Sequence, residues 1–213
     1  MATTMMGRAG TLAALIGLAA CAPQPKDPQP GAPETAGKPS RWAADPFPST
    51  YEPYASGVTA IRGATILTGA GAKIDNGVVV LSGGKIAAVG GADVAIPDGA
   101  TVIDATGKWV TPGVIDIHSH LGDYPSPAMA STSDGNEATA PNTAQVWAEH
   151  SVWPQDPGFT RALAGGITSL QILPGSANLF GGRSAILKNV PARTVQAMKF
   201  PDAPYGLKMA CGE

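Results

Sequence analysis

The first fifty residues constrain the fold most strongly, because they are unsuited to a packed core. The chain has 213 residues. Residues 1–20 are typical of an export signal, with Arg8 ahead of an apolar run too short to span about 30 Å of hydrocarbon. Residues 21–52 are a proline-rich linker that cannot bury enough apolar surface to fold. About 160 residues then remain for folding, too few for a complete eight-stranded α/β barrel of roughly 250.

A candidate lipid-attachment site lies at the end of the apolar run. Residues 18–21, with the sequence LAAC, resemble the bacterial lipobox, in which the signal is cleaved before a cysteine that is then lipidated. The resemblance predicts lipidation of Cys21 and a membrane partner reached through that lipid anchor. The protein would then be exported to the bacterial cell envelope, in the periplasm or on the outer membrane. Ordinary signal cleavage beside an incidental Cys21 is the alternative.

The charge balance argues against nucleic acid as a partner. The chain has 14 Lys and Arg against 16 Asp and Glu, for a formal net charge of -2. It therefore lacks the basic field that attracts a phosphate backbone or an anionic membrane surface. The two cysteines, Cys21 and Cys211, cannot form a disulfide framework. Neither the charge nor the cysteines indicate an oligomeric state.

Residues 53–113 consist of short apolar runs separated by glycine and Asx turn residues. Turns at this density are typical of β-hairpins. The sequence therefore predicts a small antiparallel β-sandwich domain, whose thin core needs a partner domain. The apolar runs are residues 64–67, 77–81, 85–89, 101–104 and 108–110, and the expected turns are residues 75–77, 82–84, 97–99 and 105–107.

The pattern changes to strand, helix and strand in residues 114–213. Residues 114–120 predict a strand, and residues 158–164 predict a short helix that follows a proline and ends at two glycines. Residues 167–173 predict a second, buried strand. A strand–helix–strand unit of this length implies parallel pairing of the two strands. The second half of the chain is therefore expected to begin an α/β sheet or barrel.

His118 and His120 are the candidate metal ligands. Histidines two apart on a strand have Cα atoms about 6.6 Å apart and side chains on the same face. Both imidazoles can then reach one ion at Zn–N distances of about 2.0–2.1 Å. Asp116 lies on the same face, two residues before His118. We expect it to support the ligands rather than to bind the metal itself. Two partly exposed histidines at a strand end are the alternative interpretation.

The surroundings of this strand resemble the metal-dependent amidohydrolase superfamily. Residues 111–120, TPGVIDIHSH, follow a β-module containing VVVLSGGKIAAVG at residues 78–90. Members similar to imidazolonepropionase and to the metal-dependent prolidases begin in this way, and residues 159–171 look like the family's approach to its second barrel strand. The resemblance implies a β-sandwich followed by the first part of a (β/α)8 TIM barrel, incomplete in this chain. The two histidines would then lie at the carboxyl end of the first barrel strand.

The resemblance also implies further metal ligands. In that family a lysine, often carboxylated, or a glutamate follows the two histidines, and two more histidines and an aspartate come later. Lys208, within residues 205–212, resembles the bridging lysine, and an ordinary surface lysine is the alternative. Glu213 and Lys188 are weaker candidates, and His150 is expected to be a surface or supporting residue. The implied cofactor is one or two divalent ions, with zinc the default and iron, manganese or cobalt also suitable.

The chemistry implied by the family is hydrolysis of a carbon–nitrogen bond in a small amide, cyclic amide or peptide-like substrate. A divalent ion supplies hydroxide at neutral pH and polarises the carbonyl group. The family's proton-shuttling aspartate has no match here, so no catalytic residue is assigned and an N-terminal portion of an enzyme is expected. Two alternatives are a membrane-tethered metal-binding protein that uses His118 and His120, and an inactive truncated remnant with an uncovered sheet edge.

Overall fold

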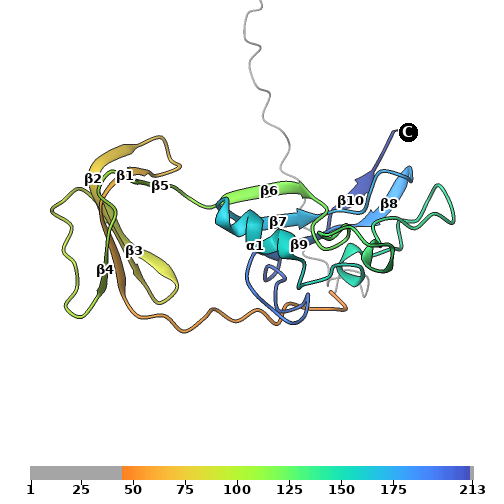
Figure 1. Cartoon of the computed structure of the whole chain (residues 1–213), viewed down its shortest axis with the longest axis horizontal. Coiled ribbons are helices and arrows are strands. Elements are labelled where there is room, and N and C mark those ends of the chain that lie inside the picture. The colour runs from red at the N-terminus through yellow and green to blue at the C-terminus, as the bar shows by residue number, and fades with distance from the viewer. Residues whose placement is uncertain (1–44, 212–213) are drawn as a thin grey trace, which may run out of the picture. The chain divides into compact units, whose positions relative to one another are not determined.

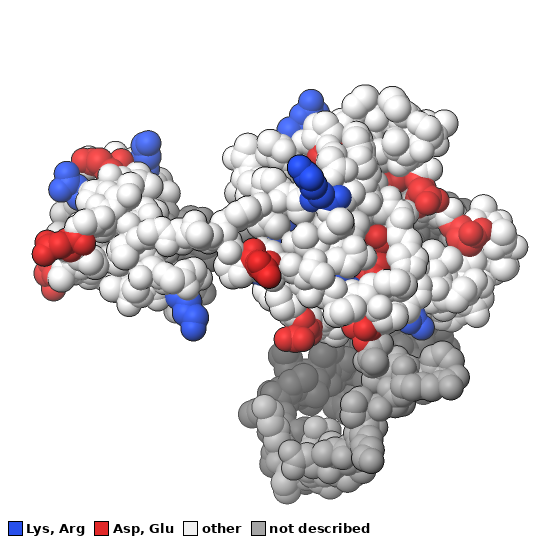
Figure 2. Space-filling view, turned by 90° about the horizontal axis from the view of Figure 1, so that it is seen from below, with Lys and Arg blue, Asp and Glu red and all other residues white. Residues whose placement is uncertain are grey.

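The computed structural model describes residues 45–211, in which two sheet regions are present (Figure 1). The β-module comprises the first five strands, and the second region comprises everything from β6 onward. Among the described residues no helix is long and apolar enough to cross a membrane. On the face shown in Figure 2, Lys and Arg side chains are scattered singly and form no basic patch.

The β-module is one mixed sheet with strand order β3-β2-β1-β4, in which β5 also pairs with β1. Small and β-branched side chains pack on both faces of it, with Val79 in one cluster and Val78 and Val80 in the other. The predicted turn at Gly83 and Gly84 is confirmed, with φ of 58° and 71°, values that favour glycine in a tight hairpin. The strands are β1 (Thr59–Leu67), β2 (Lys73–Ser82), β3 (Lys85–Gly90), β4 (Thr101–Asp104) and β5 (Trp109–Val110).

Two predictions for the β-module are wrong. Strands β4 and β5 run parallel to β1, not antiparallel, because residues 91–100 carry the chain back past the sheet before β4 begins. The turn predicted at residues 75–77 lies inside β2 instead. Asn76 has a φ of 50° there, and the β1–β2 register slips nearby, which is a β-bulge in place of a turn.

The second region contains a three-stranded sheet of order β6-β7-β9 and a two-stranded sheet of β8 and β10. Strands β6 and β7 are parallel, as predicted, and α1 lies between them in sequence. The Asp156 side chain accepts from the Gly158 N–H at 2.8 Å and so caps α1, and Pro157 occupies its first turn. The elements are β6 (Val114–Ser119), η1 (Ala130–Thr132), η2 (Ala148–His150), α1 (Pro157–Ala164), β7 (Ile167–Ile172), β8 (Phe180–Arg183), β9 (Ala185–Lys188) and β10 (Leu207–Met209).

In place of the predicted beginning of a barrel, the second region contains a single β6–α1–β7 unit with parallel strands. Strand β9 runs antiparallel to β7, because the chain turns back after β8 without a second helical crossover. No barrel is evident in residues 45–211. Strand β6 pairs with β7 alone among the described strands, and Ile115 and Ile117 on it are 66% and 72% exposed.

The core of the second region is centred on β7 and β9. Leu170, Ile172, Leu187 and Met198 are completely buried and pack together with Phe159 of α1. The alternation of β7 places Leu170 and Ile172 on one face. This core anchors β7, which in turn holds β6 and its carboxyl end in place.

Candidate metal centre

The two predicted histidines lie together at the carboxyl end of β6. Their ring centroids are 5.3 Å apart and the ring planes make an angle of 82°. Two imidazoles that bind one ion tetrahedrally, with metal–nitrogen distances of about 2.0–2.1 Å, have centroids about 5 Å apart. The spacing of His118 and His120 therefore fits two ligands of a single divalent ion.

The ring of His120 is oriented by the neighbouring strand. Its Nδ1 lies 2.7 Å from the carbonyl oxygen of Leu173, just beyond β7. A carbonyl can only accept, so Nδ1 carries the proton and the lone pair of Nε2 is left for a metal. The Leu173 N–H donates to the Ser119 carbonyl at 2.9 Å, which joins the ends of β6 and β7. The parallel pair thus fixes both the position and the tautomer of His120.

Lys208 on β10 reaches the same place from a distant part of the chain. Its Nζ lies 3.4 Å from Nε2 of His118, and the residue is only 7% exposed. The alternative of an ordinary surface lysine is therefore wrong. Pairing of β10 with β8 sets Lys208 opposite Gly182 and carries the lysine to the end of β6. The structure thus brings together all three residues that the sequence proposed as metal ligands.

Asp116 supports the strand end, in the role expected for it. Its Oδ1 accepts from the backbone N–H of His118 at 3.1 Å. Strand β6 has no described partner strand on its outer edge. The bond to Asp116 therefore satisfies a backbone N–H that would otherwise pair with a neighbouring strand. Asp116 therefore accepts a hydrogen bond from the backbone of His118 and is not a third metal ligand.

The weaker candidates do not join the histidine pair in the structure. The Nζ of Lys188 lies over the ring of Phe200 at 4.2 Å, and the ring of His150 packs against Phe47 at 4.7 Å. Cys21 and Glu213 lie outside the described residues. Within residues 45–211 no three or more His, Cys, Asp and Glu side chains form a group able to hold a metal. The donors that this part of the chain offers are two imidazoles and one lysine.

The sequence did not reveal a buried charge network around Lys199. The Lys199 Nζ lies 2.8 Å from Asp45 Oδ2 and 2.7 Å from Glu149 Oε2, and it is 2.5 Å from the Tyr205 hydroxyl. Desolvation opposes ionisation of Asp45, but hydrogen bonds led by that from Lys199 outweigh it and lower its pKa. Burial, and next the hydrogen bond to Asp45, raise the pKa of Tyr205. No local pattern could indicate this network, because its members are up to 160 residues apart.

Residues at the end of the predicted linker belong to that network. The Ser49 hydroxyl donates to the Lys199 carbonyl at 2.7 Å, and the Thr50 N–H donates to the Gln196 carbonyl at 2.9 Å. Phe47 also packs edge-on against Trp147 at 6.0 Å. Residues 45–50 are therefore held on the second region by polar and aromatic contacts.

Known proteins resemble this chain in both sequence and fold. Amidohydrolase tasK from Hapsidospora irregularis is 35% identical over 127 residues, which are 55% of this chain and 13% of that protein. Dihydroorotase from Mycobacterium tuberculosis is 49% identical over 53 residues, 25% of this chain and 11% of that enzyme. A solved amidohydrolase from Thermotoga maritima superposes with a TM-score of 0.66 at 41% identity, covering 73% of this chain and 39% of that one. No protein-family model matches the chain.

These similarities support membership of the amidohydrolase superfamily, the class that the β-module and the paired histidines also indicate. The chain spans about an eighth of the tasK protein and about two fifths of the Thermotoga protein, from coverages of 13% and 39%. The similarity therefore concerns a limited part of each relative.

Proposed function

We propose that this chain supplies the amino-terminal part of a metal-dependent hydrolase of carbon–nitrogen bonds. The observation that carries the proposal is the convergence of His118, His120 and Lys208 at the carboxyl end of β6. The relatives named amidohydrolase and dihydroorotase support the same type of chemistry. The substrate would be a small amide, cyclic amide or peptide-like molecule.

The residues present fit a divalent ion held by the two imidazoles. Zinc suits these donors best, and iron, manganese and cobalt are also compatible. When bound, such an ion supplies a water of lowered pKa and polarises the carbonyl group of the substrate. The Leu173 carbonyl holds His120 in the ligand tautomer, and Asp116 steadies the backbone of His118.

Lys208 can serve as a metal ligand only if its side chain loses its positive charge. A protonated amine 3.4 Å from His118 Nε2 would repel a cation and would compete for the imidazole lone pair. Carboxylation, which the family resemblance implies, would replace the positive charge with a negative one and supply oxygen donors. The proposal therefore includes carboxylated Lys208 as the third ligand.

The proposed location is the bacterial cell envelope, with the protein anchored through lipid on Cys21. The supporting observation is the LAAC sequence of residues 18–21 at the end of an apolar run. Metabolic labelling with a fatty acid, followed by membrane fractionation, tests it. Label on the native chain and none on Cys21→Ser is expected, whereas equal label on both would contradict the anchor.

The test of the proposed hydrolase is a combined measurement of metal content and turnover. The chain is loaded with Zn²⁺ or Co²⁺ in the presence of bicarbonate, and hydrolysis of cyclic amides, N-acyl amino acids and dipeptides is followed. Metal-dependent turnover that is lost in His118→Ala and in Lys208→Ala is the expected result. Stoichiometric metal without turnover of any of these amides would favour a metal-binding protein, and metal binding that is unchanged in His118→Ala would contradict the hydrolase. Absence of both metal binding and a cooperative melting transition would favour the inactive remnant.

A further inference from the structure

Lys208 reaches His118 from a short strand with little support of its own. Strand β10 comprises only Leu207–Met209, and among the described strands it pairs with β8 alone (Figure 1). Lys208 Nζ nevertheless lies 3.4 Å from His118 Nε2. Lysine has a long, flexible side chain, so its amine stays in one place only where the backbone beneath it is fixed. The place at which β10 begins therefore decides whether the amine meets the imidazole.

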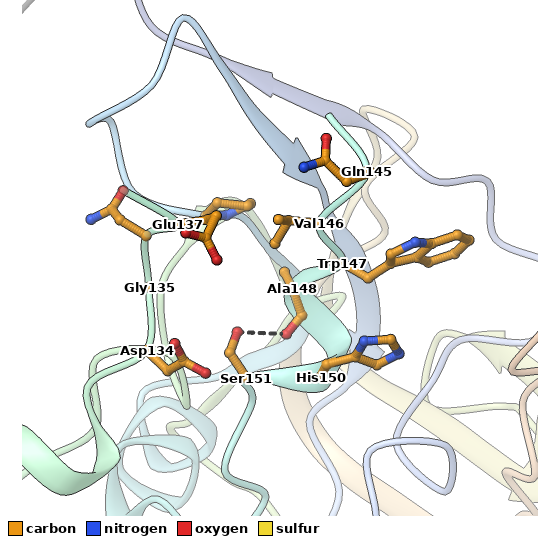
Figure 3. A pocket seen from close by; sticks show the side chains of 11 residues that line it. Asp134, Gly135, Glu137, Gln145, Val146, Trp147, Ala148, His150 and Ser151 are labelled. Carbon is orange, nitrogen blue, oxygen red and sulfur yellow. Dashed lines mark hydrogen bonds between the residues drawn. The ribbon is translucent and has the colours of Figure 1, made fainter. Parts of the chain in front are cut away.

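Strand β8, which pairs with β10, is itself held on its other edge. Residues 142–147 run beside it, and the Arg183 N–H donates to the Val146 carbonyl at 2.7 Å. Trp147 and Arg183 also form a parallel β-bridge. Figure 3 shows Val146 and Trp147 of this segment lining the adjoining cavity. Strand β8 is therefore a fixed support, against which β10 is placed.

A buried serine joins the start of β10 to the three-stranded sheet. Ser184 lies between β8 and β9 and is 1% exposed. Its N–H donates to the Gly206 carbonyl at 2.9 Å, and its Oγ accepts from the Gly206 N–H at 2.8 Å. The side-chain amide of Gln171, on β7, donates to the same Oγ at 2.9 Å. Ser184 thus links β7 to a backbone position just before Lys208.

The contacts around Ser184 leave no room for a side chain at Gly206. A Cβ added to Gly206 would lie 2.7 Å from Gln171 Nε2 and 2.8 Å from Ser184 Oγ. Alternation along β7 turns Gln171 away from the face on which Leu170 and Ile172 pack in the core. The Gln171 amide is therefore directed at the serine hydroxyl, and the close approach of the three residues fixes where β10 begins.

We propose that Ser184 is a positioning residue that keeps Lys208 against His118, and that Gln171 holds Ser184 in this role. The inference deepens the proposed function and rests on it, because Lys208 is the third ligand named there. Loss of the serine hydroxyl would leave the Gly206 N–H and the Gln171 amide without their acceptor, so the start of β10 would shift. Lys208 would move with it, whereas the two histidines would stay on β6, which pairs with β7.

The nuclear Overhauser contact between the Lys208 ε-methylene and the His118 ring tests the inference on the metal-free chain of 213 residues. The native chain should show this contact, Ser184→Ala should lose it, and Gln171→Met should weaken it. The contact between the rings of His118 and His120 should persist in every variant. The matched control is Gln155→Met, which should leave both contacts unchanged, because the Gln155 amide donates to carbonyls of residues 192 and 193 instead.

Titration with Co²⁺ in the presence of bicarbonate gives a second readout. Ser184→Ala should bind Co²⁺ about tenfold more weakly than the native chain, as expected for a residue that orients a metal ligand. The double variant Ser184→Ala, Lys208→Ala should bind no more weakly than Lys208→Ala alone, because the serine acts through the lysine. A serine that merely stabilised the fold would lower the affinity in both backgrounds.

Three results would overturn the inference. They are a Lys208–His118 contact that persists in Ser184→Ala, absence of that contact from the native chain, and additive losses of Co²⁺ affinity in the double variant. Thermal melting verifies that each variant folds. If Ser184→Ala does not fold, Gln171→Met decides, because it keeps both bonds between Ser184 and Gly206, and an unchanged contact there would overturn the inference. Failure of the native chain to bind Co²⁺ would contradict the proposed function, whereas the metal-free contact still decides the role of Ser184.

Discussion

The β-module and the second region bury different kinds of side chain. The β-module buries only aliphatic residues, such as Ala60, Ile66 and Val80. All ten buried polar or charged residues of the described chain lie between Ser119 and Lys208, in the second region. Burying a polar group is costly unless it is fully hydrogen-bonded, so polar residues in a core often mark a functional region. The contrast indicates a supporting β-module and places the candidate functional residues in the second region.

Removal of the buried cation should give the largest effect. Lys199→Met leaves Asp45 and Glu149 facing each other without a positive charge. We expect a loss of about 3–5 kcal/mol in the free energy of unfolding, measured by urea denaturation. The matched control is Lys73→Met in the β-module, where the pair with Asp75 is exposed to solvent and should contribute little to stability. Similar losses in the two variants would contradict the contrast between the regions.

Cavity-forming substitutions compare the two cores directly. Leu170, at 0% exposure, packs in the second region, and Val80, at 2%, packs in the β-module. Leu170→Ala should cost about 2–5 kcal/mol and Val80→Ala about 2 kcal/mol, because a smaller side chain leaves a smaller cavity. Thermal melting followed by circular dichroism measures both. A larger loss for Val80→Ala would mean that the β-module contains the tighter core.

Asp123 should make the stability of the second region depend on pH. Its folded-state pKa of about 8 lies above the ordinary value of 3.8, so the folded chain holds a proton that the unfolded chain releases. The stabilisation from this group is complete below pH 4 and is lost as the pH rises through 8. The slope should approach about 1.4 kcal/mol per pH unit between these limits. Asp123→Asn should remove it, and an identical pH profile in the variant would show that Asp123 ionises normally.

The hairpin turn of the β-module should give the smallest effect. Gly84 has a φ of 71°, which a residue with a Cβ adopts at a cost. Gly84→Ala should therefore lower the free energy of unfolding by about 1–2 kcal/mol. Gly57→Ala serves as the control, because nothing lies within 4 Å of a Cβ placed there. Equal effects at the two positions would mean that the turn is not rigid.

Local patterns in the sequence were sufficient for several elements. The glycine pair at the β2–β3 turn, the Asp156 cap of α1 and the parallel pairing of β6 with β7 were all predicted correctly. Each depends on residues close together in the chain or on the length of one connection. The placement of His118 and His120 together at the end of β6 was likewise indicated by their spacing.

The features that the sequence did not reveal depend on distant pairing. The parallel direction of β4 and the antiparallel direction of β9 are set by where their connections return, which composition does not specify. Burial of Lys208 beside His118 depends on pairing between β8 and β10, and the Lys199 network joins residues from both ends of the described chain.

The central claim, a metal site in the second region, is tested most directly by titration with Co²⁺ monitored by visible absorption. One ion per chain should bind to the native protein, and His118→Ala combined with His120→Ala should abolish binding. His150→Ala should bind as the native chain does, because its ring packs against Phe47 away from the pair. Unchanged Co²⁺ binding in the double variant would contradict the account.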